Sequence, residues 1–250
     1  MLSRLLSLLL TAAISAMSVF AQTSTTEELR FSTTGVWGAD QKAYLAQKPK
    51  LLTDWRKFVK LPAPPSNTSE VVGAELHELL RFQVERDKSD VARIVSERTQ
   101  SGFDFGEFKQ KTLATDWPAT KALLDLLNAE ANPIIFGAKK QFDRVRPTVL
   151  DPTLKPCIIV PPHPSYPSGH AAQAYLYAHV LTDVNFSGLE TYFHRASEIA
   201  IGREIAGVHF NSDTKAGKLL ADQIYAELQK HDCYKELVAA AKAEHSAKKK

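Results

Sequence analysis

Residues 163–181 read HPSYPSGHAAQAYLYAHVL, in which a loop with two prolines runs directly into a stretch of small and apolar residues. Within this stretch, small or apolar residues recur every three to four positions, at Ala171, Ala174, Ala178 and Leu181. That spacing places them on one face of an α-helix. Because proline restricts the backbone, the stretch predicts a helix that begins directly after a rigid turn.

The same spacing recurs on both sides of this helix. Before it, apolar residues repeat at Leu76, Leu79, Leu80 and Val84, at Leu123, Leu124 and Leu127, and at Ile134, Ile135 and Ala138. After it, they repeat at Leu189, Phe193, Ala196 and Ala200, and at Ala216, Leu219, Leu220, Ile224 and Leu228. Only CIIV at 157–160 has a strand-like composition, and it is too isolated to seed a sheet. We therefore predict an all-α fold, a single-domain helical bundle without internal repeats.

Length and composition fit one domain. The 250 residues are 44% hydrophobic, and a net charge of +3 is too small to suggest a nucleic-acid partner. We expect four segments, namely a signal peptide over 1–21, an irregular N-terminal segment over 22–60, the helical domain over 61–235 and a basic C-terminal tail over 236–250.

The N-terminus has the pattern of an export signal. Arg4 is followed by the apolar run 5–14, and Val-Phe-Ala at 19–21 fits a cleavage site before Gln22. An uncleaved membrane anchor is the alternative, but the apolar run is short and interrupted by polar residues. We expect a periplasmic or secreted protein that has no membrane attachment once the signal is removed.

The chain has two cysteines, Cys157 and Cys233. In an oxidising compartment the two could form one disulfide, and two free thiols are the alternative. Neither cysteine lies in a CxxC pair or a Cys/His array, so no metal site is expected.

Polar residues suited to one tetrahedral oxyanion occur in three groups around the loop and its helix. The groups are Lys139-x6-Arg146-Pro147, Pro167-Ser168-Gly169-His170 and Arg203-x5-His209-x3-Asp213. Arginine binds oxyanions with a planar fork and lysine adds a point charge. A helix start offers free backbone N–H groups, and a glycine there lets an anion approach closely.

The two motif histidines suit different tasks. A carboxylate at Asp213 can fix the tautomer of His209 and leave the other ring nitrogen free to attack. His170, on the expected anion-binding turn, can donate a proton to a leaving alcohol. We expect His163 to have a structural role or one at the pocket edge, because it lies outside the motif.

In this order and spacing, the three groups resemble the signature of the type 2 phosphatidic acid phosphatase superfamily. That superfamily joins bacterial class A non-specific acid phosphatases, membrane lipid phosphatases and vanadium-dependent haloperoxidases. The export signal, LPAPP at 61–65 and SYPSGH at 165–170 are most similar to the class A acid phosphatases. The similarity extends over most of the mature chain.

The resemblance implies the helical bundle of this superfamily and a role for each motif residue. His209 matches the nucleophile that forms a phosphohistidine, Asp213 its orienting carboxylate and His170 the general acid. The phosphate-binding positions are Lys139, Arg146, Ser168, Gly169 and Arg203. The family's phosphatases need no metal. One departure is Gly202, where the family usually has serine, and we expect it to alter the support of Arg203.

Three functions follow as hypotheses. The first is an exported, metal-independent acid phosphatase with a broad range of small phosphate monoesters, phosphotransferase side activity and no cofactor, for which vanadate would be an inhibitor. The second is a vanadium-dependent haloperoxidase, for which vanadate would be the cofactor. The third is a phosphate-binding protein without activity. The sequence leaves the oligomeric state open, and a homo-oligomer is compatible with it.

Overall fold

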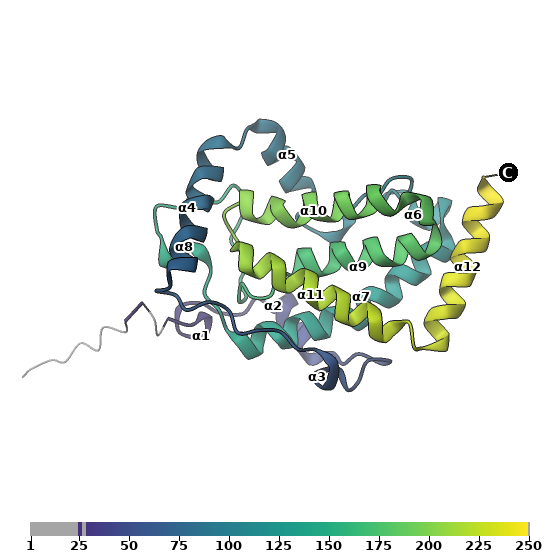
Figure 1. Ribbon diagram of the computed structural model, residues 1–250, viewed down its shortest axis with the longest axis horizontal. Coiled ribbons are helices and arrows are strands. Elements are labelled where there is room, and N and C mark those ends of the chain that lie inside the picture. Colours follow the sequence, from purple (N-terminus) through teal and green to yellow (C-terminus); the bar gives the residue numbers. More distant parts are fainter. Residues whose placement is uncertain (1–24, 27–28, 250) are drawn as a thin grey trace, which may run out of the picture.

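Helix α9 (Gly169–Val184) runs through the centre of the bundle (Figure 1). The computed structural model describes residues 25–26 and 29–249. α9 packs against α7 (Pro118–Phe142), α10 (Leu189–Ile205) and α11 (Asn211–Leu228). Apolar side chains occur on nearly all of its faces and are buried, as is typical of a helix enclosed by others. The predicted all-α single-domain bundle is confirmed, and no strand occurs in the described residues.

Small residues let α9 and α11 approach each other closely. A Cβ atom added to Gly217 of α11 would lie 2.5 Å from the carbonyl oxygen of Ser168 and 2.8 Å from the Cβ of Ala171. Any side chain at this position would push the two helices apart. The alanine-rich face of α9 therefore sets the helix spacing, and with it the distance between the two helix N-termini.

The remaining elements surround this core. They are α1 (Phe31–Thr34), α2 (Ala39–Ala46), α3 (Trp55–Phe58), α4 (Glu70–Glu85), α5 (Lys88–Ser96), η2 (Gln100–Gly102), α6 (Leu113–Asp116), α8 (Pro147–Leu150), η3 (Phe186–Gly188) and α12 (Asp232–Lys248). Three short helices thus lie in the segment expected to be irregular. α7 continues through Pro133, so the two apolar runs at 123–127 and 134–138 belong to one helix.

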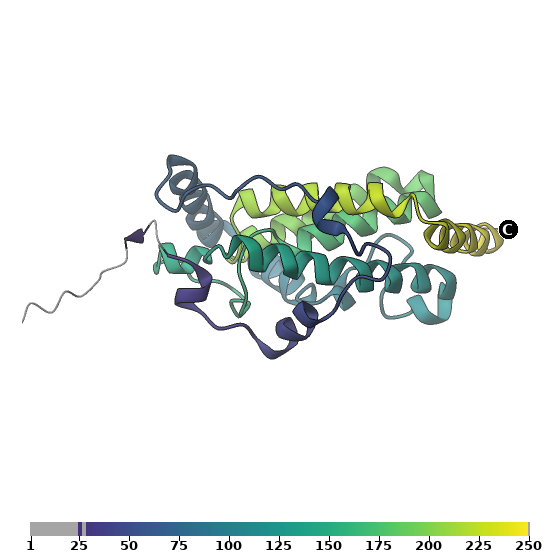
Figure 2. The ribbon, with the colours of Figure 1, turned by 90° about the horizontal axis from the view of Figure 1, so that it is seen from below.

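The proline-rich connector at 61–69 crosses the bundle from α3 to α4 (Figures 1 and 2). Its start is fixed to α11, because Lys60 donates its N–H to the side chain of Gln223 at 2.8 Å and accepts from the same side chain at 2.9 Å. The hydroxyl of Tyr166 donates to the carbonyl oxygen of Pro62 at 2.7 Å. The connector therefore also contacts the loop that precedes α9.

The C-terminal residues differ from the expected basic tail. Residues up to Lys248 form α12, which packs against α7 and α9. Glu244 accepts hydrogen bonds from the backbone N–H groups of Ala119 and Thr120 at 2.8 and 3.0 Å, and so caps the N-terminus of α7. His245 is buried against the ring of Trp117, with ring centroids 5.5 Å apart. Because lysines are frequent in α12, the spacing of its apolar residues is hard to recognise in the sequence.

The cysteines are free in the structure, so the expected disulfide is not formed. Cys157 is half-buried and packs against a small cluster that includes Ile94 and Val208, whereas Cys233 is exposed at the start of α12. The expected signal peptide at 1–21 lies outside the described residues. Within the part of the chain that is described, no helix has the length and apolar character needed to span a bilayer.

Candidate active site

Four helix ends meet at one end of the bundle, at the left in Figure 1. They are the C-termini of α7 and α10 and the N-termini of α9 and α11. A cavity of about 530 Å³ lies at this point. Five predicted site residues line it: Lys139, Gly169, His170, Arg203 and His209. The other three, Arg146, Ser168 and Asp213, are buried and do not line the cavity.

Both ring nitrogens of His209 have a partner. Nδ1 lies 3.0 Å from Oδ2 of Asp213, which also accepts the backbone N–H of Phe210 at 3.0 Å. Nε2 lies 3.0 Å from Nη1 of Arg146. A guanidinium only donates and an ionised carboxylate only accepts, so the ring proton is on Nδ1 and Nε2 presents its lone pair.

The spacing of four residues between His209 and Asp213 follows from the start of α11. Asp213 lies in the first turn, where its carboxylate reaches back to the N–H of Phe210. His209 precedes the helix by two positions and follows Gly207, whose φ of 78° ends α10 with a left-handed turn. The turn between two helices thereby brings the imidazole to the cavity.

Burial sets the charge state of this pair. Burial first, and then the charge of Arg146, lowers the pKa of His209, although Asp213 opposes the shift. Burial raises the pKa of Asp213, but the charge of Arg144 and the hydrogen bond from His209 outweigh it and hold that pKa below its usual range. The pair is therefore a neutral imidazole beside an ionised carboxylate near neutral pH.

The proline-rich loop is folded around Lys139. The ammonium of this fully buried residue donates to the carbonyl oxygens of Pro164 at 3.0 Å, Ser165 at 3.0 Å and Pro167 at 2.5 Å. An ammonium has three N–H donors, so the loop uses all of them. The three contacts require the protonated form, although burial and then Arg146 lower the pKa of Lys139. Lys139 supplies the cavity with charge and fixes the loop.

Arg146 connects the same loop to the turn before α11. Its Nε donates to the carbonyl oxygen of His163 at 3.0 Å, and its Nη1 donates to that of Val208 at 2.8 Å. Nη2 lies 3.0 Å from Nδ1 of His163, whose ring packs edge-on against Phe136. Burial lowers the pKa of Arg146 to about 9, which leaves the guanidinium charged in neutral and acid solution. His163 thus lines the cavity and contacts the motif.

His170 lines the cavity in the first turn of α9. Its Nε2 faces the carbonyl oxygens of Glu97 at 3.1 Å and Arg98 at 3.2 Å. Carbonyl oxygens only accept, so Nε2 carries a proton and Nδ1 is the nitrogen left for proton transfer. Burial first, and then the charge of Arg203, lowers the pKa of His170. A bound anion acts in the opposite direction.

Ser168 and Gly169 differ in what they offer. The Ser168 hydroxyl is fully buried and accepts the N–H of Ala171 at 3.4 Å, so it caps α9 and does not line the cavity. A Cβ at Gly169 would lie 3.5 Å from Ile135 and 3.7 Å from Lys139, which are ordinary contacts. Packing alone therefore does not require glycine at 169, and its absent side chain keeps this wall of the cavity open.

Arg203 has an unsatisfied donor. Its Nη1 is buried and has no hydrogen-bond partner among the described residues. Burial lowers the pKa of Arg203 to about 10, with the charge of Glu97 opposing. A buried donor of this kind costs free energy unless a ligand accepts its hydrogen bond. Arg203 also lines the cavity, where its positive charge favours an anionic ligand.

Gly202 makes room for a supporting ion network. A Cβ at this position would lie 3.2 Å from Nη1 of Arg93, which reaches toward Glu97 at 3.4 Å. The carboxylate of Glu97 is fully buried and also binds Arg195 at 2.5 Å. The charge of Glu97 acts on Arg203, and the effect of Gly202 on the support of Arg203 stays a prediction. Glu97 was not predicted, because nothing in the sequence links it to the motifs.

Arg144 is a second residue that sequence analysis missed. Its Nη1 donates to Oδ1 of Asp213 at 2.6 Å and to the hydroxyl of Ser212 at 2.7 Å, and its Nη2 lies 3.4 Å from Glu75. The available signal was the repeat Arg-Val-Arg, in which Arg144 precedes Arg146 by two positions. That signal does not tell which arginine faces the anion.

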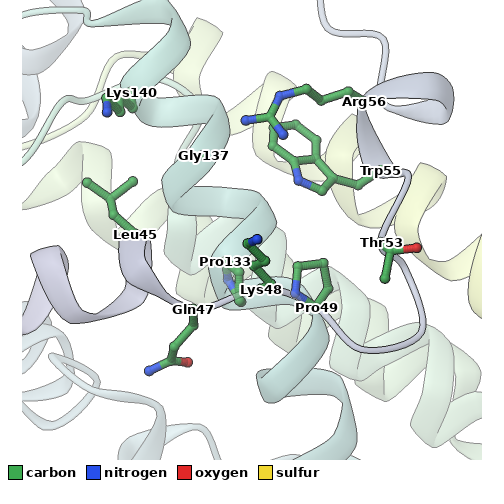
Figure 3. A pocket seen from close by; sticks show the side chains of 10 residues that line it. All are labelled: Leu45, Gln47, Lys48, Pro49, Thr53, Trp55, Arg56, Pro133, Gly137 and Lys140. Carbon is green, nitrogen blue, oxygen red and sulfur yellow. The ribbon is translucent and has the colours of Figure 1, made fainter.

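A second cavity of about 520 Å³ lies on a different face of α7, along Pro133, Gly137 and Lys140 (Figure 3). Trp55 and Arg56 form its other wall. It contains none of the predicted site residues, so the candidate active site remains the cavity at His209. Among the described residues, no group of three or more His, Cys, Asp and Glu side chains could hold a metal ion.

No model of a known protein family matches the chain. Among curated proteins, it is 28% identical to a non-specific acid phosphatase of Providencia stuartii over 134 residues, 52% of this chain and 54% of that protein. It is 27% identical to a non-specific acid phosphatase of Salmonella typhimurium over 197 residues, 74% of this chain and 78% of that protein. The match thus spans about half the length of the first relative.

Solved structures show the same fold. A bacterial vanadium-dependent iodoperoxidase superposes with a TM-score of 0.62 at 18% identity, over 82% of this chain and 62% of that one. A bacterial vanadium-dependent chloroperoxidase gives a TM-score of 0.56 at 14% identity, over 79% and 56%. The relatives confirm the predicted resemblance to the bacterial non-specific acid phosphatases, and the two haloperoxidase structures confirm the helical fold that this resemblance implied.

Proposed function

We propose that the protein is an exported acid phosphatase that hydrolyses phosphate monoesters through a phosphohistidine at His209. The observation that carries the proposal is the orientation of the imidazole, which has Nδ1 bound to Asp213 and the lone pair of Nε2 held at the cavity beside Arg146. The relatives named non-specific acid phosphatase support the same chemistry. The least specific part of the proposal is that the protein hydrolyses phosphate esters.

In the first transfer, Nε2 of His209 attacks phosphorus and the bond from phosphorus to the ester oxygen breaks. His170 gives its Nδ1 proton to that oxygen, so an alcohol leaves and the ring is left neutral. The imidazole of His209 becomes positively charged, and the Asp213 carboxylate stabilises it. Arg203 binds the phosphoryl oxygens with its unpartnered N–H group, and Arg146 does so when the phosphoryl group displaces it from Nε2.

In the second transfer, water attacks the phosphohistidine in line with the nitrogen. His170, now neutral, takes a proton from the water, and the bond between phosphorus and Nε2 breaks. Inorganic phosphate leaves, His209 is neutral again and His170 is again the acid. An alcohol in place of water would give a new ester by the same step, which is the proposed phosphotransferase side activity.

This mechanism sets the direction of the pH dependence. His209 must be neutral to attack, and its lowered pKa keeps it neutral as the pH falls. His170 must be protonated, and its pKa is lowered in the empty cavity, so a bound dianion has to raise it. We expect a bell-shaped profile with its maximum on the acid side of neutrality.

Substrate range and location belong to the same proposal. Besides the motif residues, the cavity is lined by apolar side chains such as Phe136 and Ile159 and by polar ones such as Asp40 and Gln173. The broad range of small phosphate monoesters and the lack of a metal requirement are proposed from the resemblance to the class A acid phosphatases. The export pattern at 1–21 supports a periplasmic or secreted location.

The test is hydrolysis of p-nitrophenyl phosphate from pH 4 to 9 in EDTA, with wild type and His209→Ala compared. The proposal requires turnover by wild type, an acid-labile phosphoenzyme after rapid quenching, and loss of both in the variant. Phosphate binding without turnover in wild type would instead indicate a binding protein. Turnover that persists in His209→Ala would exclude the phosphohistidine.

Vanadate-dependent halide oxidation is the second candidate. Vanadate is a tetrahedral oxyanion like phosphate, and the unpartnered Nη1 of Arg203 and the lone pair of His209 fit it equally well. When bound, it would supply Lewis-acid chemistry for peroxide. Halide oxidation that depends on added vanadate and hydrogen peroxide would support this function, whereas simple competitive inhibition by vanadate supports the phosphatase.

A further inference from the structure

A buried chain of charged groups runs behind the candidate nucleophile. The carboxylate of Asp213 is shared between His209 on Oδ2, at 3.0 Å, and Arg144 on Oδ1, at 2.6 Å. On its other side, Arg144 contacts Glu75 of α4 at 3.4 Å, and its guanidinium lies 3.9 Å above the ring of Phe210. Arg144 is 3% exposed, and its Nε is buried without a hydrogen-bond partner among the described residues, so its charge is balanced by Asp213 and Glu75.

We propose that Arg144 is a positioning residue that locks Asp213 onto His209 and, by offsetting the charge of that carboxylate, keeps the imidazole neutral in acid solution. This inference rests on the proposed phosphatase function, because it concerns the group that attacks phosphorus. It goes beyond orientation of the ring, for which Asp213 alone would suffice.

The physical reason lies in the demands of catalysis in acid. A carboxylate that contacts an imidazole favours the imidazolium, which has no lone pair to attack phosphorus. A histidine paired with an unopposed aspartate would therefore lose activity as the pH falls. The guanidinium of Arg144 sits on the far oxygen of Asp213 and opposes that effect. The aspartate can then orient the ring without making it too basic.

Other charged and titratable groups also face the pair from every neighbouring element. They are Glu75 from α4, Lys139 from α7, Arg146, His163 and Tyr166 from the loops, His170 from α9, and Arg203 and Glu204 from α10. Among the lysine and arginine side chains of the described residues, it is Arg144 that forms an ion pair with Asp213. Its removal therefore changes the charge at the carboxylate while the phosphate-binding cations stay in place.

The test is the pH profile of kcat/KM for p-nitrophenyl phosphate in a set of charge variants. The acid limb is the fall of kcat/KM at low pH. In Arg144→Gln, loss of the cation should move this limb to higher pH by about one unit, so kcat/KM at the acid end should fall about tenfold. Arg144→Lys keeps the charge, so the acid limb should stay near its wild-type position even if kcat falls because the fork is lost.

Glu75→Gln should shift the acid limb in the opposite direction. It removes the anion that partly neutralises Arg144, so the acid limb should move to lower pH. Arg86→Gln is the matched control, because Arg86 holds backbone carbonyls, including that of Ile205 at 3.0 Å, without touching Asp213. Its acid limb should coincide with that of wild type. A purely structural role predicts lower kcat in these variants with no shift of opposite sign.

A second readout separates this inference from the proposed function. The pKa of His209, measured from its imidazole ¹⁵N shifts, should rise in Arg144→Gln and fall in Glu75→Gln whether or not the protein hydrolyses phosphate esters. A wild type without turnover would refute the phosphatase and leave this comparison intact. Folded Arg144→Gln with an unmoved acid limb and an unmoved His209 pKa overturns the inference. If Arg144→Gln does not fold, the sign of the Glu75→Gln shift decides.

Discussion

Replacement of Asp213 by asparagine tests the arrangement at His209 with almost no change in shape. In the wild type, the carboxylate of Asp213 accepts hydrogen bonds from His209 and Phe210 on one oxygen and from Arg144 on the other. An amide has only one accepting oxygen. If that oxygen stays on His209, the NH₂ group meets the N–H of Arg144 at a distance of 2.6 Å, and two donors repel.

The other orientation of the amide is no better. Its NH₂ group would face the N–H of Phe210, and His209 would have to carry its proton on Nε2, where the N–H of Arg146 already points. The lone pair needed for attack is then lost. In a Ser-His-Asp triad a wrong tautomer of this kind lowers kcat by about 10⁴-fold. We expect Asp213→Asn to lower kcat by about 10³- to 10⁴-fold, or about 4 to 5.5 kcal/mol of barrier.

Stability should fall as well, by a smaller amount. Removing one partner of a buried ion pair costs about 3 to 5 kcal/mol when the other charge is left alone. Arg144 keeps Glu75 and the hydroxyl of Ser212, so the lower end, about 3 kcal/mol, is expected. Urea denaturation measures this loss, and kcat is then measured well below the unfolding midpoint.

The matched control is Asp222→Asn. Asp222 is on the same helix and binds Nε2 of His179 at 2.8 Å, but this pair is partly exposed and outside the cavity. Its removal should leave kcat unchanged. The assay is initial-rate hydrolysis with the phosphoenzyme quantified after quenching. A folded Asp213→Asn protein that retains more than a tenth of wild-type kcat would refute the tautomer argument.

Three further predictions concern the pH dependence of stability, the space at Gly202 and the removal of α12. The pKa values of His163, His170 and His209 are lowered in the folded protein, so the unfolded chain binds more protons below about pH 6.5. The free energy of unfolding should therefore fall as the pH drops below that value, by up to about 1.4 kcal/mol per pH unit for each histidine. Urea midpoints from pH 7.5 to 4.5 would show this slope, and added phosphate should reduce it. In Gly202→Ser the new Cβ crowds Arg93, and we expect a loss of about 1 kcal/mol in urea denaturation with kcat within about threefold of wild type. A chain ending at residue 231 lacks α12 and its cap on α7, so it should lose at least about 3 kcal/mol of stability, yet keep its kcat when folded because α12 lies at the opposite end of the bundle from the cavity (Figure 1).

Local patterns predicted the buried helices of the bundle but missed α12. The apolar spacing that starts at Ala171 predicted α9, since a helix buried on nearly all sides must be apolar almost throughout. α12 was missed because its charged residues are frequent and its buried face is made of separated residues such as Tyr234 and Val238. Glu244 fixes this helix to α7, and a contact between residues 125 positions apart leaves no local pattern.

The sequence by itself determined the helical bundle, the order and spacing of the three motifs, and the pairing of His209 with Asp213, because each follows from helix periodicity or from reach within one turn. Only the tertiary structure decided how the cations are used. Lys139 gives its three N–H groups to loop carbonyls, Arg144 neutralises the aspartate, and Arg203 keeps a donor unpaired. A buried charge takes its role from the acceptors that folding brings within about 3 Å, and residue type alone does not specify them.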